Sequence, residues 1–348
     1  MLPQTALFGA LALLPQALAA WPSFYSEFSS PYRNEEPDVE VKTLFQFQNN
    51  GSWIDNVVIR PDGSLLLTRL DVPEVWSVDA DSGNATLAYS FPNVTSCFGI
   101  SEIDDDVFAV VIGNFSTKTY APTPGSFSVQ KLNFKSHNTS DKRRDSQSQS
   151  PVATQIAPLP DAQALNGMVT FTKESHLVLI ADSPKGVVWK VNTKTGDYAV
   201  ALNDTTMLPA KGQALPLGIN GLKVVDGYVY YSSTTRMEFC RVKVDEEANA
   251  AGEYQVIASG FLPDGLDVAL DGTAYIATDP QNSVVRVTPY GQISLVAGGQ
   301  LSTQMPGATS CRLTADGKTL YVGTSGGQVA PVLGTFKEPA KVLKITFS

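Results

Sequence analysis

The chain has 348 residues, of which 43% are hydrophobic and 17% charged, so it contains enough apolar material for a packed core. Its net charge of −9 argues against a nucleic acid or an anionic membrane surface as a partner, and we expect neither. Only 2 histidines are present, His137 and His176, and both lie outside the polar clusters described below, which argues against a Ser-His-Asp triad or a His-rich zinc site.

Residues 1–20 are typical of a secretory signal peptide. Residues 7–14 are a short apolar stretch, and Ala17-Leu18-Ala19 supplies the small residues of a cleavage site. The stretch is too short to span a bilayer. We therefore expect a secreted glycoprotein, with candidate glycosylation sequons at Asn50, Asn84, Asn93, Asn114, Asn138 and Asn203.

One pattern recurs six times between residues 21 and 348: a small or polar cluster, a hydrophobic strand, a tight turn and a second hydrophobic strand. A repeat of roughly 45 residues built only of strands is typical of a β-propeller blade. We predict an all-β fold, a six-bladed β-propeller that forms a single domain over residues 21–348. We take as equivalent ring positions Asp55, Gly99, Asn166, Asn220, Asp264 and Ser310.

The ends of the chain predict how the ring closes. Residues 39–47 and 340–347 each have the alternating pattern of an outer strand. Pairing them within one blade would remove an exposed sheet edge, so we expect the propeller to close in this way.

Residues 135–150 interrupt the repeat and are rich in Ser, Asn, Gln and charge. We predict a disordered loop at the outer edge of a blade. The basic run Lys142-Arg143-Arg144 at its centre leaves a processing site as the alternative.

The cysteine count is odd, with Cys97, Cys240 and Cys311. At most one disulfide can form among them. We favour three unpaired core residues, because free cysteine behaves as a small hydrophobic side chain.

Four of the repeated clusters carry an oxygen-bearing side chain at the start of the first strand. In a hairpin this point lies beside the end of the second strand, so we expect Asp55, Asn166, Asn220 and Asp264 to surround one mouth of the central channel. Carboxylate and amide oxygens are ligands that Ca²⁺ accepts. The alternative is that these Asn-Gly and Asp-Gly pairs are ordinary turn residues.

Three phrases carry a resemblance to a known family: Ile219-Asn220-Gly221, Pro263-Asp264-Gly265-Leu266-Asp267 and Thr309-Ser310-Cys311. In order and blade they resemble the gluconolactonase and senescence-marker-protein (regucalcin) family of six-bladed propellers, over about residues 40–347. The resemblance implies a metal held by Asp55, Asn220 and Asp264, a substrate contact from Asn166, and a base at Asp264. The blade-one ligand of that family is usually Glu, and Asp55 is one methylene shorter, which could shift, weaken or empty the metal site.

Three functions remain open at this point. In metal-assisted lactone hydrolysis, Ca²⁺ would polarise the ester carbonyl and Asp264 would activate water. In a non-catalytic extracellular binding propeller, the polar ring would be purely structural. The third is a stereoselective cyclisation, because the chain also resembles the secreted fungal hetero-Diels–Alderases of tropolone–sesquiterpene biosynthesis.

We favour the cyclisation, an intermolecular hetero-Diels–Alder cycloaddition of a quinone methide with an apolar terpene alkene. Such an enzyme orients two small molecules, needs no cofactor and stabilises developing charge through hydrogen bonds. We expect a monomer with Asp264, Asn166 and Asn220 as catalytic residues. The expected substrate contacts are Arg69, Arg236, Thr309 and Ser310 as donors, and Trp53, Phe98 and Met168 as an apolar wall.

Those substrate contacts also have a plain structural interpretation. Large apolar side chains usually serve packing. Arg69 and Arg236 are close in sequence to Asp71 and Glu238, with which they could form surface ion pairs.

Overall fold

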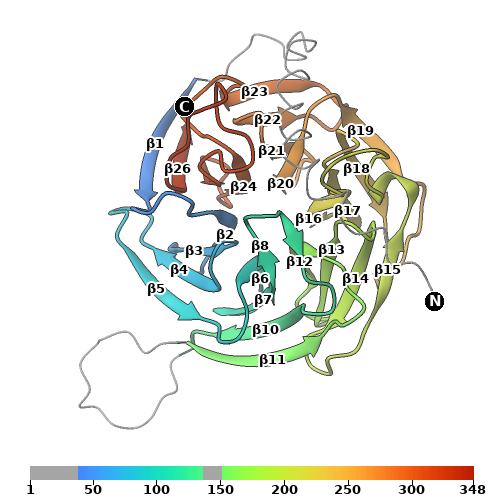
Figure 1. Ribbon diagram of the computed structural model, residues 1–348. Coiled ribbons are helices and arrows are strands. Elements are labelled where there is room, and N and C mark those ends of the chain that lie inside the picture. Colours follow the sequence, from blue (N-terminus) through green and yellow to red (C-terminus); the bar gives the residue numbers. More distant parts are fainter. Residues whose placement is uncertain (1–37, 136–150) are drawn as a thin grey trace, which may run out of the picture.

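The computed structural model describes residues 38–135 and 151–348. These residues form six four-stranded antiparallel sheets arranged as blades around a central axis (Figure 1). The predicted six-bladed β-propeller is thereby confirmed. The predicted signal peptide, the sequon at Asn138 and all but the first residue of the predicted loop 135–150 lie outside the described residues.

Each blade runs from an inner strand at the axis to an outer strand at the rim. Blades one and two are β2 (Ile54–Ile59), β3 (Leu65–Arg69), β4 (Glu74–Val78) and β5 (Ala85–Ser90), then β6 (Ser96–Asp104), β7 (Val107–Gly113), β10 (Ser128–Asn133) and β11 (Val152–Pro158). Blades three and four are β12 (Leu165–Thr172), β13 (Leu177–Asp182), β14 (Val187–Asn192) and β15 (Tyr198–Asn203), then β16 (Ile219–Val225), β17 (Tyr228–Ser233), β18 (Glu238–Lys243) and β19 (Gln255–Ser259). Blades five and six are β20 (Pro263–Val268), β21 (Ala274–Thr278), β22 (Ser283–Val287) and β23 (Ile293–Gly298), then β24 (Ala308–Leu313), β25 (Thr319–Thr324), β26 (Lys341–Phe347) and β1 (Val39–Gln46).

Blade six closes the ring, because it combines strands from both ends of the described chain. β1 pairs antiparallel with β26, in a register that runs from Val39 opposite Phe347 to Gln46 opposite Lys341. Figure 1 shows the blue N-terminal strand beside the red C-terminal one. The predicted closure within one blade is therefore confirmed.

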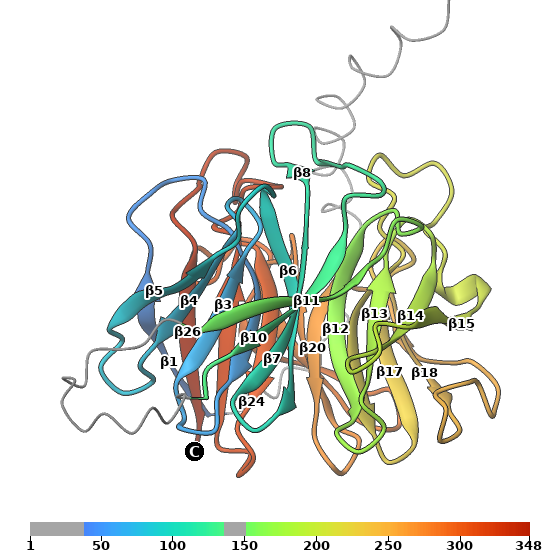
Figure 2. The same ribbon diagram turned by 90° about the horizontal axis from the view of Figure 1, so that it is seen from below.

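Blade two carries an insertion that the repeat pattern did not predict. Between β7 and β10 the chain forms a small hairpin of β8 (Phe115–Ser116) and β9 (Ala121–Pro122). Figure 2 shows it projecting from the end of the propeller. The extra length of this repeat, assigned from sequence to residues 135–150 alone, is thus shared with a structured element.

The core lies between the blades, where six clusters of buried side chains fill the spaces between sheets. Full burial of each Val, Leu or Ile side chain contributes roughly 1.5–3 kcal/mol. Cys97, Cys240 and Cys311 are buried and unpaired, as expected. Outside the sheets, the described chain has one 3₁₀ helix, η1 (Thr205–Met207), and no helix in that part is long and apolar enough to cross a membrane.

Candidate functional site

A β-bulge or irregularity interrupts the pairing of each inner strand near its start. In β16 the pairing with β17 shifts between Ile219 and Leu222, and Asn220 lies in the shifted segment. The other inner strands have the same irregularity close to their first residues. Because a bulge redirects a side chain, each blade can contribute one residue to the mouth without losing its sheet.

Glycine follows several of these mouth residues because the next blade passes very close. A Cβ on Gly167 would lie 2.5 Å from the carbonyl oxygen of Asn220, and one on Gly221 would lie 2.8 Å from that of Asp264. All these glycines lie within strands, so the turn interpretation of the Asn-Gly and Asp-Gly pairs is wrong.

The same contacts correct two of the six ring positions. Gly167 follows the ring residue Asn166 and packs against the backbone of the next ring residue, Asn220. Gly99 packs in the same way against the backbone of Asn166, so it is equivalent to Gly167. The ring residue of blade two is therefore the residue before it, Phe98. In blade five, Gly265 packs against the carbonyl oxygen of Thr309, so the ring residue of blade six is Thr309 rather than Ser310. The ring therefore consists of Asp55, Phe98, Asn166, Asn220, Asp264 and Thr309.

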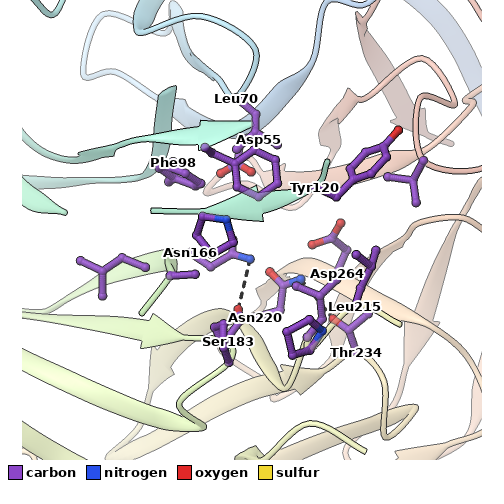
Figure 3. A pocket seen from close by; sticks show the side chains of 18 of the residues that line it. Asp55, Leu70, Phe98, Tyr120, Asn166, Ser183, Leu215, Asn220, Thr234 and Asp264 are labelled. Carbon is purple, nitrogen blue, oxygen red and sulfur yellow. Dashed lines mark hydrogen bonds between the residues drawn. The ribbon is translucent and has the colours of Figure 1, made fainter. Parts of the chain in front are cut away.

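Two hydroxyl groups orient the ring asparagines. The Asn166 Nδ2 donates to Ser183 Oγ at 3.3 Å (Figure 3). This hydroxyl donates to the backbone carbonyl of Ile219 in blade four at 2.6 Å. In the next blade, Asn220 Nδ2 donates to Thr234 Oγ1 at 3.1 Å, which donates to a carbonyl of blade five at 2.8 Å. Because each amide nitrogen faces its hydroxyl, each amide oxygen is turned away from it.

Three carboxyl groups converge in the pocket at this mouth, those of Asp55, Asp264 and Asp279. Burial raises the pKa of Asp55 to about 7, although Asn56 donates a hydrogen bond to it at 2.7 Å. Burial likewise raises the pKa of Asp279 to about 7. The pKa of Asp264 is raised well above its usual range, first by burial and then by the negative charges of Asp279 and Asp55.

Apolar side chains form the walls of the same pocket. The empty space of this pocket, counted together with the open solvent at its mouth, is ≈ 930 Å³. No Lys, Arg or His is present among the described residues that line it. The apolar lining comes from Trp53, Leu70, Phe98, Phe115, Tyr120, Pro122, Ala164, Leu165, Pro184, Leu215, Pro216, Leu217 and Val329 (Figure 3).

Tyr120 reaches this wall from the β8–β9 hairpin. Its hydroxyl donates to the carbonyl oxygen of Gln328 in the β25–β26 connection at 2.9 Å, and its ring lies 6.3 Å from that of Trp53. The hairpin of blade two is therefore tied to blade six across blade one. The pocket wall depends on this contact.

The structure gathers six of the predicted site residues at one pocket. These are Asp55, Asn166, Asn220, Asp264, Trp53 and Phe98.

The two arginines expected as donors are engaged elsewhere and do not line the pocket. Arg69 forms ion pairs with Asp71 and Glu74, and its guanidinium lies 4.4 Å from the ring centroid of Phe47. Arg236 pairs with Glu238 at 3.1 Å.

The remaining predicted contacts are buried in the propeller. Met168 is packed in a core cluster. Thr309 Oγ1 donates to the carbonyl oxygen of Ile54 at 2.7 Å, joining blade six to blade one. Ser310 Oγ is buried without a hydrogen-bond partner among the described residues.

Sequence reasoning gave Asp279 no role in the site and missed Tyr120 as a pocket residue. Asp279 directly follows β21, at one of the strand ends that share the rim, but an acid occurs there without a repeated counterpart that would single it out. Tyr120 lies on the unpredicted hairpin, and the sequence contains no signal for its position.

The metal ligands that the resemblance implies all lie in this pocket. Asp55, Asn220 and Asp264 line one pocket, and two carboxylates with an amide oxygen are chemically suited to a hard cation such as Ca²⁺. Over residues 38–135 and 151–348, no three His, Cys, Asp or Glu side chains are grouped so that they could hold a metal by themselves. Asp55 and Asp264 could therefore hold a metal only together with the amide oxygen of Asn220 as the third ligand.

Fold and site together define a six-bladed propeller with a central pocket that has acidic and amide groups at one part and apolar walls around it. Among solved structures, the chain is similar to regucalcin, a calcium-binding protein from Agrobacterium tumefaciens (TM-score 0.60, 14% identity, 89% of this chain and 95% of that one). It is also similar to a gluconolactonase from Xanthomonas campestris (TM-score 0.56, 12% identity, 89% and 90%). At these identities the likeness concerns the fold alone.

In sequence, the chain is similar to two proteins named hetero-Diels-Alderases. The relative from Phoma sp is 29% identical over 307 residues, which is 78% of this chain and 83% of the relative. The relative from Sarocladium schorii is 28% identical over 319 residues, 78% of this chain and 75% of the relative. No family model matches. Both expected resemblances are confirmed, one in fold and one in sequence.

Proposed function

We propose that this protein is a secreted, monomeric enzyme that catalyses a stereoselective intermolecular hetero-Diels–Alder cycloaddition of a quinone methide with an apolar terpene alkene. The similarity to two proteins named hetero-Diels-Alderases supports the reaction class. The observation that carries the proposal is the division of one pocket into a polar part and a large apolar wall, without any basic side chain among its described lining residues.

This division suits two reactants of unlike polarity. The oxygenated quinone methide would lie against Asn166, Asn220 and Asp264, and the alkene against the apolar wall. Holding both reactants in reactive geometry converts a bimolecular encounter into an effectively intramolecular reaction. The effective molarity of well-oriented reactions of this kind reaches about 10⁵–10⁸ M. The carbonyl oxygen of the quinone methide gains negative charge, and a hydrogen bond donated to it would lower the barrier further. Asp264 would supply this donor, because its raised pKa keeps a proton on the carboxyl group.

The test is product stereochemistry. The purified protein is incubated with a quinone methide generated in buffer and a hydrocarbon sesquiterpene alkene, and the adduct is separated by chiral chromatography. We expect one enantiomer in large excess and a rate above that of the heat-denatured protein. A racemic adduct formed at the background rate would contradict the proposal.

Calcium-dependent lactone hydrolysis is the second candidate, favoured by the convergence of Asp55, Asn220 and Asp264 on the same pocket. Ca²⁺ bound to this trio would polarise a lactone carbonyl. Cycloaddition that survives a chelator supports the first function, whereas aldonolactone hydrolysis lost to a chelator and restored by Ca²⁺ supports the second. Calorimetric Ca²⁺ titration gives an independent readout, because Asp55→Glu should tighten Ca²⁺ binding only if a metal is held there.

Secretion is supported by the signal-like residues 1–20 and by sequon asparagines on the surface. Asn50, Asn84, Asn93 and Asn203 are exposed, and Asn114 is half-buried. Expression of the full chain in a fungal host should place the protein in the medium, with a mass that falls on treatment with an N-glycosidase. Retention of an unmodified protein inside the cells would contradict this part of the proposal.

A further inference from the structure

Asp279 lines the pocket and has one buried carboxyl oxygen without a hydrogen-bond partner among the described residues. It follows β21 at the mouth, lines the pocket and is only 8% exposed. Its Oδ2 accepts a hydrogen bond from Ser325 Oγ at 3.1 Å. Its Oδ1 is buried and has no hydrogen-bond partner among the described residues.

The position of this side chain is well defined. Ser325 is anchored because its backbone N–H donates to the carbonyl oxygen of Gly307 at 2.7 Å. Gly307 in turn donates to Asn282 Oδ1 at 2.8 Å. One oxygen of Asp279 is therefore fixed by the scaffold.

A buried acceptor without a partner costs about 1–3 kcal/mol, so such groups in folded proteins call for an explanation. None of the described side chains donates a hydrogen bond to this oxygen. The hydroxyl of Tyr120, which also lines the pocket, donates to Gln328 instead. The missing donor is best explained as part of a ligand.

We infer that Asp279 Oδ1 accepts a hydrogen bond from a hydroxyl group of a neutral substrate and thereby determines specificity. One free acceptor matches the single hydrogen of a hydroxyl, and the apolar walls of the pocket disfavour a charged group. An anionic group would be repelled by the nearby carboxyl groups. Applied to the reaction, this inference rests on the proposed function and assigns the hydroxyl to the oxygenated reactant.

Binding of matched probes tests the inference without any reaction. Isothermal titration calorimetry with 4-propylphenol and 4-propylanisole compares ligands that differ in the hydroxyl hydrogen and one methyl group. The titration is done at pH 8, above the pKa of about 7 that burial gives Asp279, so that this carboxyl is mostly charged. Because a hydrogen bond to a charged group contributes about 1.5–3 kcal/mol, the wild-type protein should then prefer the phenol by about tenfold or more. In Asp279→Leu the two affinities should agree within about twofold.

Asp279→Asn keeps the shape of the side chain and replaces the leucine variant if that variant does not fold. It should reduce the preference for the phenol over the anisole by at least about threefold. Asp316→Asn, at an exposed turn, is the matched control and should retain the full preference. Equal binding of both probes by the wild type, an unchanged preference in both Asp279 variants, or tighter binding of 3-phenylpropylammonium would overturn the inference. A preference that depends on Asp279 in a protein without cycloaddition activity would leave the inference standing and remove the proposed function.

Discussion

At the level of single residues, the carboxyl groups in the pocket impose a pH dependence on stability. The pKa of Asp279 is about 7 in the folded protein because burial disfavours its charged form, compared with an ordinary value of 3.8. Between pH 3.8 and about pH 7, the Asp279 carboxyl is ionised in the unfolded chain but retains its proton in the folded chain. Stability therefore falls as the pH rises through this window, and no penalty from this group remains below it.

Asp279→Asn removes this penalty, because the amide is neutral at every pH. Relative to wild type, the variant should gain stability between pH 4 and pH 8, by up to about 4 kcal/mol, since each unit of pKa difference corresponds to about 1.4 kcal/mol. Urea denaturation at both pH values measures the difference. Asp316→Asn is the control, since hydrogen bonds from Thr314 and Lys318 lower the pKa of that exposed carboxyl and predict no such gain. The prediction would be contradicted if the free energy of unfolding of the variant differed from that of the wild type by the same amount at both pH values.

Residues that repeat around the ring were predictable, and residues that occur once were not. Asp55, Asn166, Asn220 and Asp264 occupy equivalent positions, so their convergence followed from the repeat alone. The apparent donor Arg69 is neutralised by acids close to it in sequence, which the pattern allowed but could not decide.

At the level of elements, the inner strands combine a bulge with a close backbone contact. Gly221 of β16 is the clearest case, because an added Cβ would lie 2.8 Å from the carbonyl oxygen of Asp264 and 3.0 Å from the Cα of Gly265. Both neighbours are backbone atoms of the next blade, so neither can move independently. The position of Asp264 in the pocket therefore depends on the absence of a side chain at residue 221.

Gly221→Ala should destabilise the protein by about 1–3 kcal/mol through overpacking, and should also weaken binding in the pocket by displacing Asp264. Gly252→Ala is the matched control: this glycine is exposed, and the nearest atom to an added Cβ is Lys243 Cβ at 3.2 Å. Thermal unfolding and titration with 4-propylphenol provide the two readouts. Equal effects of both substitutions on stability and binding would rule out the proposed role of the close contact.

The β8–β9 hairpin shows where pattern reading fails at this scale. Its strands have two residues each, too few to show an alternation of apolar and polar residues. Its position is set by a tertiary contact, the hydrogen bond from Tyr120 to Gln328. Local sequence does not encode that contact in a recognisable way.

At the level of the whole molecule, closure of the ring brings the starts of the six inner strands together at one end of the central channel. The polar part of the pocket comes from the repeated inner strands, which is why sequence located it. Much of the apolar wall comes from the connections between strands, including the segment 215–217 and Val329, whose positions depend on how blades pack. The six-bladed architecture and its closure could therefore be predicted, but the β8–β9 hairpin could not. Most of the pocket residues that could be predicted belong to its polar part, with Trp53 and Phe98 from the apolar wall.

Closure also predicts how the fold should fail. β1 is paired with β26 over its whole length, and together with the neighbouring blade it covers apolar side chains of blade six. A chain that begins at Gln48 would lack β1 and leave β26 as an unpaired edge strand, which favours association with other chains. We expect this variant to lose its cooperative thermal transition and to aggregate, whereas a chain that begins at Asp38 retains both the transition and a monomeric state. Calorimetry and size-exclusion chromatography of the two variants provide the measurement, and a folded, monomeric chain beginning at Gln48 would show that the terminal strand is dispensable for closing the ring.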